Sequence, residues 1–310
     1  MEIKLGYCCI STIHEKLRCN RCSTKTYLES KSQMKGHDLL VEKARENLHD
    51  LCQLLQENYK NKIFAFRISE QLLPQIDLGY YTIDELDEEL KKVGKIANEY
   101  DIQLSTHPSQ YYVLNSLKDE VVQRSINSLN LYAKILKRMN LERHPNIILH
   151  VGVKNGYETT EKACDAFCKN FRQLDMIAQS YLVIENDHVS FTVEDCLYIH
   201  RKIGIPIVFD NMHYHWNPGN LTFQQAVNEV VKTWGNRIPK FHLASDKEEK
   251  KHAHDDYVLI SDYLELETAI EKTGIDQCYI MLECKQKDKA VLKLYEYQKE
   301  MKFVAVRKGL

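Results

Sequence analysis

The sequence predicts an α/β fold of the (β/α)8 barrel (TIM-barrel) type, with its active site at the carboxyl ends of the strands. The chain has 310 residues, 44% hydrophobic and 28% charged, which suits one barrel of ordinary composition. Eight short apolar runs alternate with eight longer amphipathic stretches, and no linker interrupts them. A doubly wound open sheet is the alternative, but no glycine-rich phosphate-binding turn follows the first run. We therefore expect a single domain over residues 1–310.

Eight runs rich in Ile, Val, Leu and Phe have the length of buried strands. They cover residues 3–9, 63–68, 102–108, 146–150, 181–185, 205–210, 238–243 and 277–283. Stretches with helical periodicity separate them, at residues 37–59, 82–99, 119–139, 158–178, 192–203, 222–234, 262–272 and 288–301. The second of these helices carries a start signal, because Thr82 and Glu85 have the spacing of a capping box.

The composition argues against several classes of protein. The sequence has no apolar run of membrane-spanning length and no secretory leader, so we expect a cytoplasmic protein with no membrane partner. The ten cysteines are scattered, and we expect them to be reduced. Cys19 and Cys22 form a CxxC motif, but no second pair completes a four-ligand zinc site.

A net charge of −2 disfavours binding of nucleic acid by overall attraction. The charge is uneven, however, because the segment Ser11–Gly36 contains six lysines and arginines and only two glutamates. This segment is either a solvated loop or a surface that contacts phosphates.

Polar side chains of metal-ligand type stand at the predicted strand ends. They are His107, His150, Glu185, Asp210 with His213, Lys240 with His242, and Glu283. Strand ends of a barrel converge on one mouth, where so many buried polar groups would cost several kcal/mol each without partners. Metal ions would supply those partners. One of His252 and His254, in the loop after the seventh strand, could complete the site beside Asp210 and His213.

Histidine and carboxylate ligands without thiolate indicate Zn²⁺, Mn²⁺ or Fe²⁺. The donors outnumber the ligands of one ion, so we expect two or three ions, with Glu185 as the bridge between them. Such sites stabilise the attacking and leaving oxygens of a phosphoryl displacement. The residues thus predict a metal-dependent hydrolase of phosphate esters, whose nucleophile is hydroxide generated on a metal.

The chain also resembles the UV damage endonuclease family, whose barrel is related to that of endonuclease IV. The matching segments follow the family's order along nearly the whole chain. They are residues 5–7, 66–69, 106–111, 149–152, 184–187, 210–213, 240–242, 254–257 and 282–285.

The resemblance implies an endonuclease that nicks duplex DNA on the 5′ side of ultraviolet photoproducts, with up to three metal ions. The ions are typically Mn²⁺, and Zn²⁺, Mg²⁺ and Co²⁺ are alternatives. The implied ligands are His107, His150, Glu185, Asp210, His213, His242, His254 and Glu283. Among these, Glu185 and Glu283 are also implied in catalysis. Lys240 matches a catalytic lysine that can be carboxylated and then faces the metals. Damaged double-stranded DNA is the implied partner, and no obligate protein partner is expected.

The resemblance further implies lesion-binding roles for Gln110, Tyr111, Tyr7 and Ser11. Gln110 and Tyr111 match a pair that wedges into the duplex where the damaged dinucleotide flips out, and flipping is easiest where a lesion has weakened stacking. Tyr7 would lie at the mouth beside the flipped lesion, and the basic loop would then contact phosphates.

Two departures from the family pattern affect the expected substrate range. Many members have a histidine soon after the proline equivalent to Pro74, where this chain has no histidine and Asp77 is a possible replacement. A family asparagine near the mouth is Ser11 here.

Three other functions remain open from the sequence. An abasic-site endonuclease of the endonuclease IV kind would share the metal ligands, although Gln110, Tyr111 and Lys240 favour the ultraviolet enzyme. A metal-dependent sugar isomerase would also have His and carboxylate residues at strand ends, but would need a small closed pocket. A protein that binds damage without cutting would not need so many ligands.

Overall fold

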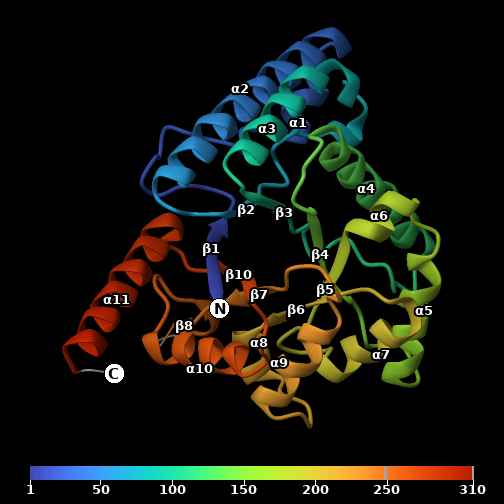
Figure 1. Ribbon diagram of the computed structural model, residues 1–310. Coiled ribbons are helices and arrows are strands. Elements are labelled where there is room, and N and C mark those ends of the chain that lie inside the picture. The colour runs from blue at the N-terminus through green and yellow to red at the C-terminus, as the bar shows by residue number, and fades with distance from the viewer. Residues whose placement is uncertain (248–249, 309–310) are drawn as a thin grey trace.

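The computed structural model describes residues 1–247 and 250–308, and eight parallel strands close into a barrel at its centre (Figure 1). The strands pair around the ring in the order β1-β10-β7-β6-β5-β4-β3-β2. Their bounds are β1 Glu2–Cys8, β2 Ala65–Ile68, β3 Gln103–Thr106, β4 Asn146–His150, β5 Leu182–Glu185, β6 Ile207–Asp210, β7 Lys240–Leu243 and β10 Gln277–Leu282. The predicted TIM barrel is confirmed.

Helices surround the barrel (Figure 1). They are α2 Gln33–Lys60, α3 Asp87–Glu99, α4 Asp119–Arg138, α5 Thr160–Phe171, α6 Met176–Tyr181, α7 Val193–Ile203, α9 Phe223–Lys232, α10 Ile260–Glu271 and α11 Lys287–Lys308. The helix predicted at 158–178 is two helices, α5 and α6. The capping box of Thr82 and Glu85 is present, and it starts the short 3-10 helix η2 (Ile83–Leu86) that precedes α3.

Several short elements were not predicted from the sequence. The helices α1 (Lys25–Glu29) and α8 (Asn211–Trp216) and the 3-10 helix η1 (Ile76–Leu78) lie in segments that connect strands. After β7, the strands β8 (Asp246–Lys247) and β9 (Lys250–His254) form an antiparallel hairpin. These elements are too short to show a hydrophobic period in the sequence.

Strand residues of alternate parity pack into different cores, as expected for side chains that point to opposite faces of a strand. Ile147 and Leu149 belong to the large core that includes the helices. Ile148 belongs instead to a small separate cluster with Val183 and Val208 of the neighbouring strands and with Trp234, on the inner side of the barrel. Two residues further along these three strands come His150, Glu185 and Asp210. The parity therefore directs these polar side chains inward, above the apolar cluster.

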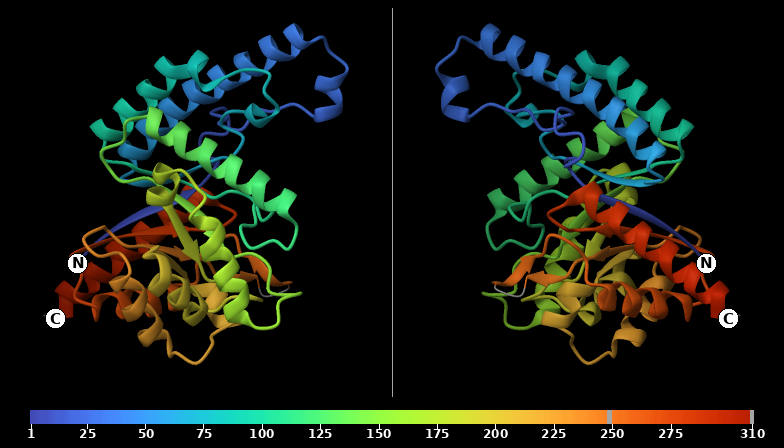
Figure 2. Two further views of the ribbon diagram at one scale, coloured as in Figure 1. Left: turned by 90° about the vertical axis from the view of Figure 1, so that its right-hand side faces the viewer. Right: turned by 90° about the vertical axis from the view of Figure 1, so that its left-hand side faces the viewer.

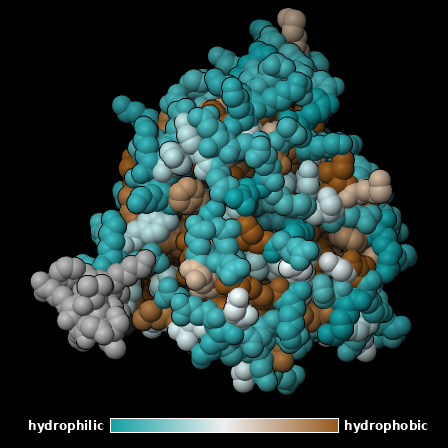
Figure 3. Space-filling model, viewed as in Figure 1, coloured by the Kyte–Doolittle hydropathy of each residue, from teal (hydrophilic) through white to brown (hydrophobic). Residues whose placement is uncertain are grey.

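The two ends of the barrel differ in shape and surface. In Figure 2, α1 and the first turns of α2 project beyond the barrel on the side toward which β1 points. The face that carries the N-terminus is mostly hydrophilic, with small hydrophobic patches (Figure 3). In the part of the chain that the structure describes, no helix combines the length and hydropathy needed to cross a membrane.

The packing of α3 against the end of α4 gives a test of the fold. A Cβ atom added to Gly94 would lie 1.5 Å from the backbone oxygen of Met139, which follows α4. Although alanine is the better helix former, we expect Gly94→Ala to lower the free energy of unfolding by about 1–3 kcal/mol through overpacking. Urea denaturation measures this, with Lys95→Ala on the exposed side of α3 as the matched control. Equal stability of the two variants would contradict this account of the packing.

Candidate active site at the carboxyl ends of the strands

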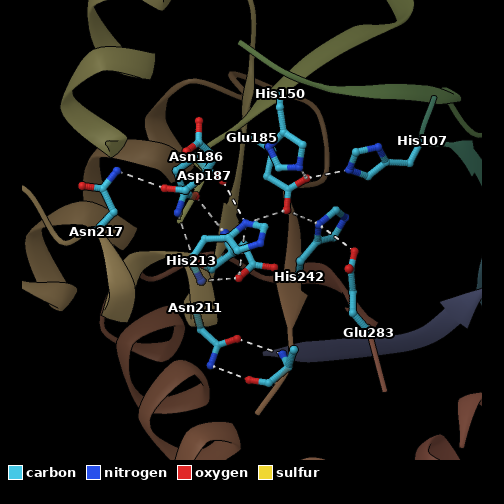
Figure 4. A network of polar contacts seen from close by, with 12 residues as sticks. His107, His150, Glu185, Asn186, Asp187, Asn211, His213, Asn217, His242 and Glu283 are labelled. Carbon is cyan, nitrogen blue, oxygen red and sulfur yellow. Dashed lines mark hydrogen bonds and ion pairs between the residues drawn. The ribbon is translucent and has the colours of Figure 1, made fainter. Parts of the chain in front are cut away.

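The Glu185 carboxylate lies at the centre of a cluster of imidazoles (Figure 4). Glu185 is the last residue of β5, and its side chain is buried. Glu185 Oε2 lies 2.9 Å from His107 Nε2 and 3.8 Å from His150 Nε2. Glu185 Oε1 lies 2.8 Å from His242 Nδ1 and 3.5 Å from His213 Nδ1. One carboxylate thus joins side chains from the ends of β3, β4 and β7 and from α8, which follows β6.

Two further carboxylates flank the same imidazoles. Glu283 Oε1 lies 3.2 Å from His242 Nδ1, and Glu283 Oε2 lies 3.9 Å from His254 Nδ1. Asp210 Oδ1 lies 3.8 Å from His213 Nδ1. His254 arrives from the β8–β9 hairpin and not from a barrel strand.

Asparagine side chains fix the positions of neighbouring strand ends. Asn186 accepts a hydrogen bond from the backbone N–H of Asp210 and donates one to its carbonyl, at 3.0 and 3.1 Å. Asn211 makes the same reciprocal pair with Ala244, at 2.9 and 3.0 Å (Figure 4). Asp210 is also the N-cap of α8, where its side chain accepts from the His213 N–H at 2.7 Å. The local hydrogen bonds therefore order the backbone beneath the cluster.

The electrostatics keep Glu185 and Glu283 ionised. Burial alone would raise the pKa of Glu185, but the imidazoles of His242 and His150 hold it well below its usual range. Burial likewise opposes ionisation of Glu283, but the Arg67 guanidinium lowers its pKa. Burial raises the pKa of Asp210 to about 7. For His213, burial favours the neutral form, yet the nearby Asp210 and Glu185 charges raise its pKa to about 10.

The donors fit divalent metal ions. Within the described residues, His107, His150 and Glu185 form one group whose candidate ligand atoms lie within 4.8 Å of one another. Glu185, Asp210, His242 and Glu283 form a second such group. Asp210 Oδ2 is buried without a hydrogen-bond partner, and a carboxylate oxygen in that state normally needs a cation or donor. Imidazole and carboxylate donors suit Zn²⁺, Mn²⁺ and Fe²⁺. Glu185 belongs to both groups.

Comparison with known proteins identifies the family. A sequence model described as "UV-endonuclease UvdE" matches residues 3–308. The chain belongs to the UvdE family. A relative called "UV DNA damage endonuclease" from Clostridium perfringens is 31% identical, over 96% of this chain and 71% of that protein. One of the same name from Halalkalibacterium halodurans is 30% identical, over 95% of this chain and 93% of that protein.

A solved structure of the UvdE family shares the whole fold. The structure titled "Crystal Structure of SacUVDE" has a TM-score of 0.86 and 28% sequence identity, and the match covers 97% of this chain and 99% of that one. The resemblance inferred from the sequence is therefore confirmed, and the fold matches from one end of the chain to the other.

The structure brings together all eight residues predicted as ligands: His107, His150, Glu185, Asp210, His213, His242, His254 and Glu283. His252 was the other histidine considered, and its side chain is not among those that the structure describes. Gln110 and Tyr111 follow His107 in the β3–α4 loop, and Tyr111 is 71% exposed. Their accessibility suits contact with a large ligand.

Three of the residues predicted to contact the lesion or to face the metals are buried within the protein, and for Tyr7 this overturns the predicted place at the mouth. Tyr7 is fully buried on the helix side of β1, where its hydroxyl donates to Asn58 of α2 at 2.9 Å. Ser11 is buried and its hydroxyl donates to Asp288, so it anchors its loop to α11. Lys240 was expected at the carboxyl end of its strand but is the first residue of β7, and its Nζ donates to the side-chain oxygen of Gln103.

The basic segment is partly paired. Arg21 forms ion pairs with Glu46 and Asp50, at 3.0 and 2.8 Å. The exposed basic residues of the segment are Lys16, Arg18, Lys25, Lys31 and Lys35. Cys19 is buried, Cys22 is exposed, and all ten cysteines are free. The segment presents positive charge around α1, and its CxxC motif forms no disulfide.

Two residues of the site were missed in the sequence. Arg67 of β2 is buried, and its Nη2 donates to Glu283 and to His242 Nε2, the latter at 2.8 Å. The His188 ring centroid lies 5.3 Å from that of His213. Signals for both existed: Arg67 is a cation within an apolar strand, and His188 follows Glu185 by three residues, as His213 follows Asp210.

The shared position of Glu185 gives a test of the metal centre. We expect Glu185→Gln to weaken binding of Mn²⁺ by about 100-fold or more, since even partners outside the ligand shell are worth about 10–100-fold. Calorimetric titration of metal-depleted protein measures this. Glu265→Gln, at an exposed glutamate paired with His215, is the matched control and should bind as the unmodified protein does. Unchanged affinity in Glu185→Gln would exclude Glu185 as the bridge.

Proposed function

We propose that this chain is a metal-dependent DNA repair endonuclease that nicks duplex DNA on the 5′ side of ultraviolet photoproducts. Pyrimidine dimers are the proposed main substrate, and 6-4 products and abasic sites are further candidates. The observation that carries the proposal is the Glu185 carboxylate, which lies in both groups of metal-ligand atoms. Relatives named UV DNA damage endonuclease supply the substrate class.

The chain's own residues would hold two or three divalent ions, with Mn²⁺ proposed. His107 and His150 would bind on one side of Glu185, and Asp210, His242 and Glu283 on the other. His213 and His254 extend the set toward a further ion. Bound there, the metals would supply a hydroxide nucleophile and neutralise charge on the phosphodiester.

The protein residues around the cluster would orient its ligands. Arg67 fixes Glu283 and contacts His242, and Asn186 and Asn211 fix the strand ends. Gln110 and Tyr111, exposed on the loop that follows His107, would enter the duplex and replace the stacking lost when a lesion flips out. The exposed lysines around α1 would contact phosphates, which position DNA without reading its sequence.

Nicking of supercoiled plasmid tests the proposed chemistry and specificity together. With Mn²⁺, we expect ultraviolet-irradiated plasmid to be nicked and untreated plasmid to remain closed, and we expect chelator to abolish nicking. Mapping of the cut on an end-labelled duplex with one dimer should place it on the 5′ side. Equal nicking of both plasmids would remove damage recognition from the proposal. Cutting of abasic duplex but not of irradiated duplex would favour an abasic-site endonuclease.

Replacement of Tyr111 separates damage recognition from metal binding. We expect Tyr111→Ala to keep the Mn²⁺ stoichiometry and to weaken binding to lesion-containing duplex by about 1–3 kcal/mol, the range for one stacked aromatic. Fluorescence anisotropy in Ca²⁺ or without metal measures binding apart from cleavage. Tyr59→Ala, at an exposed tyrosine near the end of α2, is the matched control. Loss of metals from Tyr111→Ala would show that the residue supports the metal centre instead.

A further inference from the structure

A separate cavity lies at the opposite end of the barrel from Glu185. Its volume is about 230 Å³. Gln103 and Asn146, the first residues of β3 and β4, line it together with the segment 236–238 before β7 and Tyr279 of β10. None of the predicted metal ligands lines this cavity. It is therefore distinct from the mouth.

Arg237 places unpaired donors in this cavity. Its Nε and Nη2 atoms are buried, and no described residue accepts a hydrogen bond from either. Its guanidinium stacks over the ring of Trp234, 5.2 Å from the ring centroid. Burial lowers the pKa of Arg237. A buried N–H donor without an acceptor is costly, and cation–π stacking satisfies neither of these two donors.

The remaining wall adds donors and one carboxylate. Tyr279 is 3% exposed, and its hydroxyl also has no hydrogen-bond partner among the described residues. Arg143 lines the cavity as well, but its guanidinium pairs with Asp101 at 2.8 Å. Glu142 is the carboxylate in the wall; it is exposed, and its backbone N–H donates to Asn98. Buried donor atoms of Arg237 and Tyr279 thus line one small space, and none of them has an acceptor among the described residues.

We propose that this cavity binds a phosphate-sized oxyanion between Arg237 and Tyr279. A guanidinium presents paired N–H donors that match the oxygens of phosphate or sulfate, and a tyrosine hydroxyl supplies a third donor. The anion would connect the segment before β7 with β10 and the starts of β3 and β4. Because it binds only the folded barrel, it would stabilise the fold in proportion to its concentration. The inference does not depend on the proposed nuclease activity.

Trp234 provides a local readout. The chain has two tryptophans, so in a Trp216→Phe background the emission comes from Trp234, which lines the cavity. Inorganic phosphate is titrated into metal-depleted protein at constant ionic strength, with chloride as the balancing anion. We expect a saturable change in emission, and we expect sulfate to compete.

Matched variants assign the response to the cavity. We expect Arg237→Gln to weaken phosphate binding by at least about tenfold, as for loss of a hydrogen bond to a charged group. Tyr279→Phe should weaken phosphate binding by about 2- to 10-fold. This second variant tests the cavity if Arg237→Gln does not fold. Arg201→Gln, at an exposed arginine on α7, and Glu185→Gln should both leave it unchanged.

Three outcomes would overturn the proposal. The first is the absence of a saturable response, which would mean that the cavity holds water only. The second is a response in Arg237→Gln and Tyr279→Phe equal to that of the unmodified cavity, which would place the anion elsewhere. The third is loss of the response in Glu185→Gln, which would move phosphate binding to the mouth. Plasmid nicking is measured separately, so failure of either proposal leaves the other standing.

Discussion

Glu185 holds a negative charge inside a barrel whose next layer is apolar, and its two oxygens are reached by imidazoles from the ends of β3, β4, β6 and β7. Each of these contacts requires the strands to be closed in the right order and register. A shift of one residue in any strand would turn its polar side chain toward the helices. The fold and the chemistry thus depend on the same constraint, which is the inward parity of the strand ends.

The same parity explains what could be read from the sequence. A buried strand that ends in Asp or Glu is visible without a structure, and in a barrel all such ends meet, so Glu185, Asp210 and Glu283 could be brought together in advance. The apolar residues do not show which alternate positions of a strand face the barrel interior, because both faces of these strands are buried. Tyr7 shares the parity of Leu5, which packs in the large core, and for this reason it lies against α2 and not at the mouth.

The exact residues at which strands begin and end were the second limit on what the sequence could predict. Lys240 and His242 have the same parity, but β7 has four residues, so one lies at its start and the other near its mouth. The strand predicted from the sequence covers six residues, 238–243, so it does not show that Lys240 lies at the start of β7 and His242 near its carboxyl end. Ser11 and Arg67 depend on contacts with residues 277 and 216 positions away, which no local pattern encodes. Conversely, most of the candidate ligands could be named from the sequence because each ends a barrel strand or closely follows one.

The β8–β9 hairpin affects how long a metal ion would stay bound at the candidate site. Six of the eight candidate ligands stand on barrel strands or on the residue that directly follows one, and His213 lies on α8, which begins directly after β6. His254 instead ends an antiparallel hairpin that, within the part of the chain that the structure describes, pairs with no barrel strand. Displacement of the hairpin therefore breaks no pairing of the closed sheet. We expect an ion held by His254 to exchange with solvent faster than one held by His107 and His150. An ion held by His107 and His150 would thus stay in the barrel, while an ion held by His254 would be replaced repeatedly from solvent.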